Sequence, residues 1–375
     1  MQAYETEIDG YISELNKKRF KELHEIKTTF QKMDKDAETL SSHLLVDVPK
    51  PSTDDLNRNV IAVDGSNYQE KYESVSATIA TAYVYMTHGS MERYLPQISI
   101  VPPYYATLVN SINMKRLEYE IARDVLNRLE KMEQSPSIVL LDGTITFPDE
   151  ALSEYSDLAP WIKQAYDQYT KIANDFYEYI LDKNVLVASV VKDSLANKYF
   201  ISLYTSLKEK KFSNLEIPNE ELSDLNLIIN KWGKNGEYAS VSEFGMIKRI
   251  FSDLTFKRTK YIEVTQALRA EIPISQLKGS VIGFYIKTID SQKPFFVEVP
   301  AKFKDEIDTI SQVISSFSYY SLRPGYPMPL YIAHKKAELK KKNARNIIAL
   351  FKNLTRKDFP EYYYYLWEDR FHESL

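Results

Sequence analysis

The first stretch of the chain alternates apolar and charged positions with a helical period. Apolar residues recur there mostly every three or four positions, at Ile8, Ile12, Leu15, Leu23, Ile26, Phe30 and Met33. This spacing predicts one long amphipathic helix, whose apolar face must cover either its own domain or a second subunit. Pro49 and Pro51 then end the helical register, so we expect an N-terminal helical segment over residues 1–48.

Short apolar runs replace the helical pattern after this segment. Residues 60–63 are Val-Ile-Ala-Val and are followed by Asp-Gly-Ser, which is typical of a buried strand that ends in a turn. Residues 74–86 and 94–101 are rich in β-branched and aromatic side chains, and we expect two further strands there.

The next segments alternate between helical and strand patterns. Residues 105–133 are helical in pattern, and residues 138–141 form a second apolar run that is followed by Asp-Gly-Thr. A helical stretch then continues to about residue 180, and residues 185–191 form another apolar run. Three strands followed by alternating helices and strands is the order of a ribonuclease H-like core. We therefore expect an α/β fold with a mixed sheet flanked by helices.

The second half of the chain is less regular. Residues 199–276 are more polar, and we expect them to form a subdomain inserted into the core. Strand character resumes at residues 281–287 and 295–299, and helices are predicted over residues 304–317 and 330–351.

These patterns predict three parts. The helical segment over residues 1–48 is followed by an α/β domain over residues 59–350, which includes the insertion over residues 199–276. An aromatic tail over residues 351–375 completes the chain and contains the run Tyr-Tyr-Tyr-Tyr-Leu-Trp. The tail and the N-terminal helix are candidates for contacts with a partner or with the core.

The composition restricts the class of protein. The chain has 375 residues, of which 44% are hydrophobic, and this is enough to bury a large core. It has no cysteine, which excludes disulfides, thiolate metal sites and a cysteine nucleophile. The charged N-terminus lacks the apolar segment of a secretory signal, and no run approaches the ~18 apolar residues of a membrane span. We therefore expect a cytoplasmic protein that does not enter a membrane.

The charge balance limits how the chain could bind nucleic acid. Because the net charge is −4 and the pI is near 5.9, such binding must come from a local basic patch, bound cations or a partner. Two groups of residues could make a patch: Lys335, Lys336, Lys340, Lys341, Lys342 and Arg345, and secondly Lys257, Arg258 and Lys260. The alternative for both groups is a solvated surface.

Two of the apolar runs end in Asp-Gly, with Asp64 after the first and Asp142 after the second. A carboxylate at the end of a buried strand is costly unless its charge is compensated, and a divalent cation with oxygen ligands can compensate it. If the two strands are neighbours, the carboxylates face each other at the sheet edge where ligands gather in α/β proteins. The alternative is that Asp-Gly is a favoured turn in both places.

Further candidates lie outside the strands. Glu118 and Glu120 lie in the first predicted helix of the α/β domain, and because residues two apart point about 200° apart around a helix, they are not interchangeable. His334 follows a Pro-rich segment, and its imidazole could bind a metal or exchange a proton near neutral pH. Surface positions for the carboxylates and a structural role for the histidine are the alternatives.

Taken in order, these segments resemble the NurA family of nucleases. The resemblance rests on Asp-Gly-Ser after the first strand, Leu-Glu on the helix, Leu-Asp-Gly-Thr, a strand followed by lysine, and Tyr-Pro with a later histidine. The residues that match are Asp64, Glu118, Asp142, Lys192, Tyr326 and His334. Thr144 stands where the family usually has serine, and Glu120 remains the alternative to Glu118.

The resemblance implies a manganese-dependent deoxyribonuclease, with Mg²⁺ as the alternative cation. One metal ion would activate the attacking water and another would stabilise the leaving oxygen. The implied ligands are Asp64, Glu118, Asp142 and His334. Lys192 would neutralise the scissile phosphate or orient the nucleophile, and Tyr326 would contact DNA or pack beside the metals.

The resemblance also implies partners. It implies a homodimer that acts on DNA ends together with a HerA-type hexameric ATPase, as a 5′–3′ exonuclease, an endonuclease or both, in repair or antiphage defence. The sequence has no GxxxxGK[ST] phosphate loop, so a partner would have to supply the ATP site. Two other functions stay open: another ribonuclease H-like nuclease that cleaves RNA, and a non-catalytic scaffold subunit of a motor complex.

Overall fold

The computed structural model describes residues 2–72, 74–88, 93–145, 160–192, 198–209, 215–233, 236–238, 242–264, 275–277, 281–290, 293–321 and 325–367. The helices are α1 (Gln2–Leu44), α2 (Ala106–Lys131), α4 (Pro160–Asp182), α5 (Lys198–Glu209), α6 (Asn219–Ile229), α7 (Glu243–Phe251), α8 (Ile307–Tyr319), α9 (Met328–Ala337), α10 (Lys341–Asp358) and α11 (Pro360–Trp367). The strands are β1 (Leu45–Asp47), β2 (Val60–Lys71), β3 (Ser76–Met86), β4 (Arg93–Val101), β5 (Ile138–Asp142), β6 (Leu186–Val191), β7 (Lys257–Thr259), β8 (Ile262–Glu263), β9 (Val281–Lys287) and β10 (Phe295–Pro300). Short 3-10 helices are η1 (Asp54–Asn57), η2 (Asn230–Trp232), η3 (Ser275–Leu277) and η4 (Ala301–Glu306). None of the helices in these ranges is both long and apolar enough to cross a membrane.

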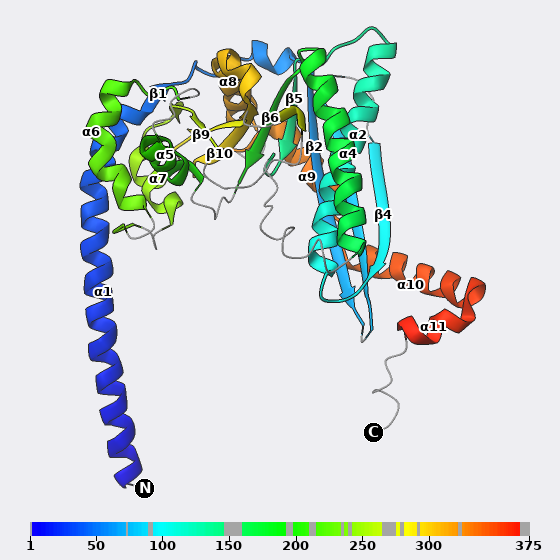
Figure 1. Ribbon diagram of the computed structural model, residues 1–375, viewed down its shortest axis with the longest axis horizontal. Coiled ribbons are helices and arrows are strands. Elements are labelled where there is room, and N and C mark those ends of the chain that lie inside the picture. The colour runs from blue at the N-terminus through cyan, green and yellow to red at the C-terminus, as the bar shows by residue number, and fades with distance from the viewer. Residues whose placement is uncertain are drawn as a thin grey trace.

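One mixed sheet organises this part of the chain (Figure 1). Its strand order is β1-β7-β9-β10-β6-β5-β2-β3-β4, and β8 pairs with β9. Strands β2, β3 and β4 form an antiparallel meander, and β5 and β6 then follow parallel to β2. This is the predicted order of a ribonuclease H-like core, so the predicted α/β fold with a mixed sheet flanked by helices is confirmed.

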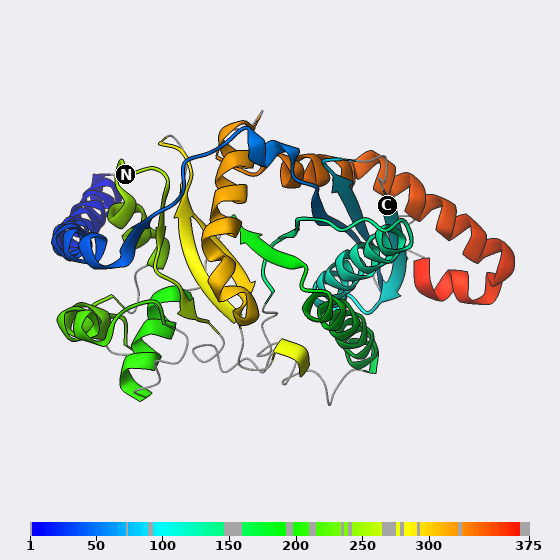
Figure 2. The same ribbon diagram turned by 90° about the horizontal axis from the view of Figure 1, so that it is seen from above.

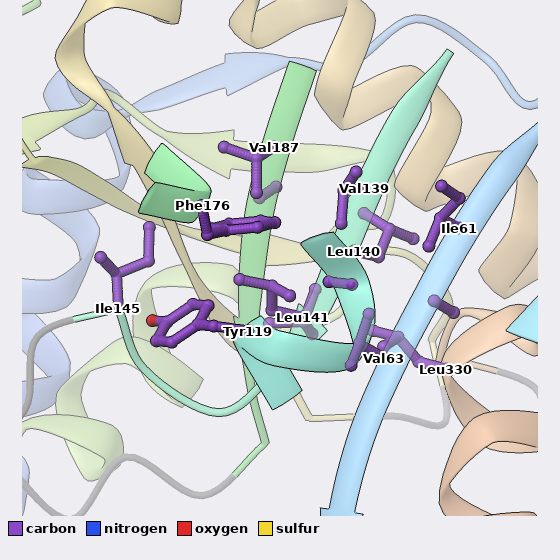
Figure 3. Packing of buried hydrophobic residues seen from close by; sticks show 14 of the residues in the cluster. Ile61, Val63, Tyr119, Val139, Leu140, Leu141, Ile145, Phe176, Val187 and Leu330 are labelled. Atoms are coloured by element: carbon purple, nitrogen blue, oxygen red, sulfur yellow. The ribbon is translucent and has the colours of Figure 1, made fainter. Parts of the chain in front are cut away.

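The parallel strands β2, β5 and β6 lie at the centre of the sheet. Their near-continuous apolar runs suit strands that are covered on both faces, and β2 is aligned with β5 over four residue pairs that end at Val63 and Leu141. Helices α2 and α4 lie on one side of the sheet, and α9 lies on the other (Figure 2). In Figure 3, Tyr119 of α2 lies beside Leu141, and Leu330 of α9 lies beside Val63.

The turn predicted after Asp64 is wrong, because β2 continues to Lys71 and stays paired with β3. Instead, the glycine at position 65 allows helix α2 to lie close to the main chain of β2. A Cβ atom at Gly65 would lie 2.6 Å from Oε1 of Glu118 and 2.6 Å from Cγ of Met114, both on α2. Only glycine leaves room for that contact.

The turn predicted after Asp142 is confirmed. Strand β5 ends at Asp142, and Gly143 has a φ of 87°, a conformation that residues with a side chain seldom adopt. The Gly143 N–H donates to the carbonyl of Val190 on β6 at 3.0 Å. The two Asp-Gly pairs therefore have different structures, although their sequences are the same.

The single helix predicted over residues 330–351 is wrong, because α9 and α10 are separated by a short extended segment. Strands β2 and β3 provide hydrogen bonds at this break. The Thr81 hydroxyl donates to the carbonyl of Ala337 at 3.1 Å, and the Leu339 N–H donates to the Ser66 hydroxyl at 3.3 Å. These bonds satisfy backbone groups that the end of a helix leaves unpaired.

The described part of the segment over residues 199–276 contains three helices, α5 to α7, and joins the main sheet through β7 and β8. Its apolar residues form a second core with the C-terminal part of α1. In this core Phe200 stacks on Trp232, with ring centroids 4.6 Å apart, and Leu40 of α1 is fully buried. This part of α1 therefore covers its own chain, while the first part projects away from the body (Figure 1). The domain boundaries stay a prediction.

The aromatic tail packs on its own chain where it is described. Trp367 is 4% exposed and meets Tyr72 edge to face, with ring centroids 4.9 Å apart. Together with Ala344 and Ile348 of α10 it forms a small third core against Ile79 of β3. Helices α10 and α11 are thereby held on the meander.

Leu40→Ala is expected to destabilise the protein, because Leu40 is fully buried between α1 and the second core. Loss of a buried leucine side chain lowers the free energy of unfolding by about 2–5 kcal/mol. Ile12→Ala is the matched control, because Ile12 is 48% exposed on the first part of the same helix; it should change this energy by less than about 0.5 kcal/mol. Urea denaturation followed by circular dichroism measures both variants, and equal effects would contradict the packing of α1 on its own chain.

Candidate metal centre

Asp64 and Asp142 lie close together because β2 and β5 are parallel neighbours. Val63 is aligned with Leu141, so each aspartate comes one residue after an aligned pair, at the same level of the sheet. Asp142 continues the ladder opposite Val190 of β6. The meeting of two carboxylates that the sequence indicated is present in the structure.

His334 joins them from α9. Its Nδ1 lies 2.7 Å from Oδ2 of Asp64, and one possible ligand atom from each of Asp64, Asp142 and His334 lies within 4.8 Å of the other two. We call these three residues the donor cluster. The His334 side chain is 40% exposed, against 7% for Asp64, so the donor cluster opens to solvent on the side of the imidazole.

Glu118 of α2 lies next to the donor cluster. It is 1% exposed, and its Oε1 is the atom that a Cβ at Gly65 would meet. The Glu120 side chain is 41% exposed, and its Oε2 lies 3.5 Å from Nη1 of Arg116 on the same helix. Of the two glutamates that the sequence left open, the structure brings Glu118 to the site.

Burial controls the charge of these carboxylates. It raises the pKa of Glu118 to about 8 against the opposing ammonium of Lys115, and the charges of Asp64 and Asp142 add to the rise. Burial also raises the pKa of Asp64, and the charge of Asp142 adds to that shift. A divalent cation relieves this crowding of carboxylates, and their oxygens with an imidazole nitrogen form a donor set that fits such a cation.

Lys115 is a member of the site that the sequence analysis missed. Its buried ammonium donates to Oε2 of Glu118 at 2.5 Å and to the main-chain carbonyl of Asp142 at 2.7 Å. A spacing of three residues on a helix is the signal for an ion pair between Lys115 and Glu118. Such pairs are common on helix surfaces, so the spacing alone does not show that this pair is buried and ties α2 to the end of β5.

Lys192 and Tyr326 extend the site beyond Asp142. The Lys192 ammonium donates to Oδ2 of Asp142 at 2.6 Å and lies 4.2 Å from the centroid of the Tyr326 ring. Tyr326 is 9% exposed, so its ring supports the lysine from inside the protein by a cation–π contact. All six residues that carried the family resemblance thus lie in one region, and their roles stay predictions.

Comparison with known proteins adds family and fold. The model of the NurA domain family matches residues 58–339, and no curated protein sequence matches the chain. Among solved structures, the NurA nuclease from Sulfolobus solfataricus is 17% identical with a TM-score of 0.51, over 91% of this chain and 98% of that one. Two other crystal structures of NurA are each 13% identical with a TM-score of 0.46. The match to the first spans 84% of this chain and 92% of the NurA chain. The match to the second, a structure of NurA with manganese, spans 90% of this chain and 99% of the NurA chain.

Glu118→Gln is expected to flatten the pH dependence of stability in the metal-free protein. Glu118 has an ordinary pKa near 4.5 in the unfolded chain and a pKa of about 8 in the folded one, so the folded state holds the proton more tightly. Its contribution to stability is therefore full below pH 4.5 and is lost as the pH rises toward 8. Urea denaturation in EDTA from pH 5 to 8 measures the slope. Glu120→Gln is the control that should keep the wild-type slope, and an unchanged slope in Glu118→Gln would contradict the burial of that carboxyl.

Proposed function

The chain belongs to the NurA family, and from that membership and the geometry of the site we propose that it is a metal-dependent nuclease that acts on DNA. The observation that carries this proposal is the donor cluster, whose ligand atoms lie within 4.8 Å of one another at the carboxyl ends of two parallel strands. Ligands gather at that edge in α/β proteins, and carboxylate-held divalent cations serve in nucleases.

The ligands in this proposal are Asp64, Asp142 and His334, with Glu118 beside them. Mn²⁺ suits this mixture of oxygen and nitrogen donors, and Mg²⁺ is the alternative, although it favours oxygen donors alone. When bound, such a cation supplies Lewis-acid activation of the phosphodiester and of the water that attacks it.

The two lysines of the site, Lys192 and Lys115, have different roles in this proposal. The side chain of Lys192 is 34% exposed, so its ammonium can turn from Asp142 to a phosphate oxygen that gains negative charge during hydrolysis. The Tyr326 ring keeps that ammonium near the site. Lys115 is buried and holds the Glu118 carboxylate in place.

A basic surface beside the site binds DNA in this proposal. The three lysines at residues 340–342 are exposed and follow closely after His334 in the chain. In the second basic group, Arg258 pairs with Glu216 at 2.6 Å and Lys260 pairs with Glu221 at 2.5 Å. Near His334, Lys335 also pairs with Glu338 at 3.1 Å and Arg345 lies 3.8 Å from Glu70. The exposed lysines at residues 340–342 are therefore the better candidates for phosphate contacts.

We further propose that the protein processes DNA ends as a homodimer with a HerA-type hexameric ATPase, as a 5′–3′ exonuclease, an endonuclease or both, in repair or antiphage defence. Because the sequence has no GxxxxGK[ST] loop, movement along DNA driven by ATP would use the ATP site of a second protein. Exposed apolar side chains on α10 and after it support a second copy: Leu350, Leu354 and Phe359 are 65%, 57% and 58% exposed.

End-labelled linear DNA should be degraded by the purified protein in Mn²⁺ and should stay intact in EDTA. Asp64→Asn is expected to lower the rate by at least about 100-fold, because it neutralises a ligand of the proposed metal centre. Glu120→Gln is the control on the same helix that should keep the wild-type rate, because its side chain is 41% exposed and faces Arg116, not the donor cluster.

The same assay separates the other functions. Single-stranded DNA, double-stranded DNA and RNA of one sequence are compared, with and without a HerA-type ATPase and ATP. Cleavage of RNA alone would indicate a different ribonuclease H-like nuclease. Intact substrates under every condition would remove the nuclease proposal and favour a scaffold subunit.

Replacing the three lysines at residues 340–342 by alanine should weaken DNA binding and its dependence on salt. Each lost phosphate contact lowers the slope of log K against log salt by about 0.9, so loss of all three should lower it by about 2–3. Fluorescence anisotropy in the Asp64→Asn background measures binding without cleavage. The matched control replaces the exposed basic residues 17–19 of α1 by alanine; an equal change in the control would contradict a local binding surface.

A further inference from the structure

A buried carboxylate of β10 holds the turn that follows Asp142. Glu298 is fully buried, and its Oε2 accepts hydrogen bonds from the Thr144 hydroxyl at 2.7 Å and from the Ile145 N–H at 2.6 Å. Thr144 and Ile145 come two and three residues after Asp142 in the chain, with Gly143 between. The conformation of the main chain beyond this member of the donor cluster is therefore set from a distant strand.

Lys198, the first residue of α5, completes the arrangement. Its ammonium donates to Oε1 of Glu298 at 2.7 Å and to the Thr144 hydroxyl at 2.7 Å. Burial raises the pKa of Glu298, but the Lys198 ammonium and the hydrogen bonds outweigh it, so the pKa lies below its ordinary value. The two side chains form this ion pair although they are only 10% and 0% exposed, and hydrogen bonds from Thr144 and Ile145 satisfy the second carboxylate oxygen.

An ion pair of this kind contributes little to stability, since burying two charges costs about as much as their attraction returns. Its effect here is on geometry. The turn after β5 is fixed at three places: Lys115 binds the Asp142 carbonyl, Gly143 binds the Val190 carbonyl, and Glu298 binds the two residues that follow. With the main chain fixed on each side of Asp142, the starting direction of its side chain is set, and the hydrogen bond from Lys192 at 2.6 Å then holds its carboxylate.

We propose that Glu298, held by Lys198, is a positioning residue that directs the Asp142 carboxylate into the donor cluster and so sets the affinity of the site for its divalent cation. This inference rests on the proposed function, because it assumes that the donor cluster binds a metal. It adds two residues, from β10 and α5, that act on the donor cluster through the turn after Asp142 and not as ligands.

The test is Mn²⁺ binding by isothermal titration calorimetry on the full chain, with no substrate present. The double variant Lys198→Met/Glu298→Leu removes both charges and leaves apolar side chains, which is the exchange that buried ion pairs tolerate. It also leaves the Thr144 hydroxyl and the Ile145 N–H without their acceptor, so its midpoint of urea denaturation should fall by the cost of these unpaired buried donors. The folded variant should bind Mn²⁺ about 10- to 100-fold more weakly, as loss of groups that orient ligands does. The control is Lys231→Met/Asp36→Leu, which removes a partly buried ion pair between η2 and α1 and should keep the wild-type affinity.

Thr144→Val provides a second test in case the double variant does not fold. It deletes the hydroxyl that joins Glu298 and Lys198 but keeps the shape of the side chain, and it should weaken Mn²⁺ binding by several-fold. Wild-type affinity in a folded double variant, or in Thr144→Val if the double variant does not fold, would overturn the positioning role and leave a purely structural ion pair. Absence of Mn²⁺ binding in the wild-type protein would instead overturn the metal centre itself, and the positioning role with it.

Discussion

The parallel pairing of β2 with β5 brings two carboxylates together at one edge of the sheet, and the site is organised around their repulsion. Asp64 and Asp142 directly follow the buried, paired segments Val60–Val63 of β2 and Ile138–Leu141 of β5, so they cannot move apart. Lys192 places its ammonium against the Asp142 carboxylate, and Nδ1 of His334 lies 2.7 Å from Oδ2 of Asp64. In the proposed function a divalent cation is the remaining compensating charge.

The sequence was sufficient for the central strands and for the main donors. Apolar runs buried on both faces are easy to recognise because they have no polar alternation, and their order predicted the meander and the parallel strands that follow. Once β2 and β5 were expected to be neighbours, the Asp-Gly after each run placed Asp64 and Asp142 together without further information. The choice between Glu118 and Glu120 needed the rotation of α2, which the spacing of apolar residues alone left open.

The features that the sequence did not reveal depend on contacts between distant segments. Gly65 suggested a turn, but the close approach of α2 explains it. The break between α9 and α10 is stabilised by hydroxyl groups on β2 and β3. Glu298 reads as one polar residue in an apolar strand, and only its contact with a turn 154 residues earlier gives it a role.

The separation of Asp64 and His334 along the chain has a consequence for protein synthesis. The hydrogen bond between them joins residues 270 positions apart. At a translation rate of about 5–20 residues per second, the histidine leaves the ribosome roughly 15 to 55 seconds after the aspartate. Strands β2 and β5, which carry the two aspartates, are made well before His334. The donor cluster is therefore completed only late in synthesis, when the histidine of α9 becomes available to Asp64.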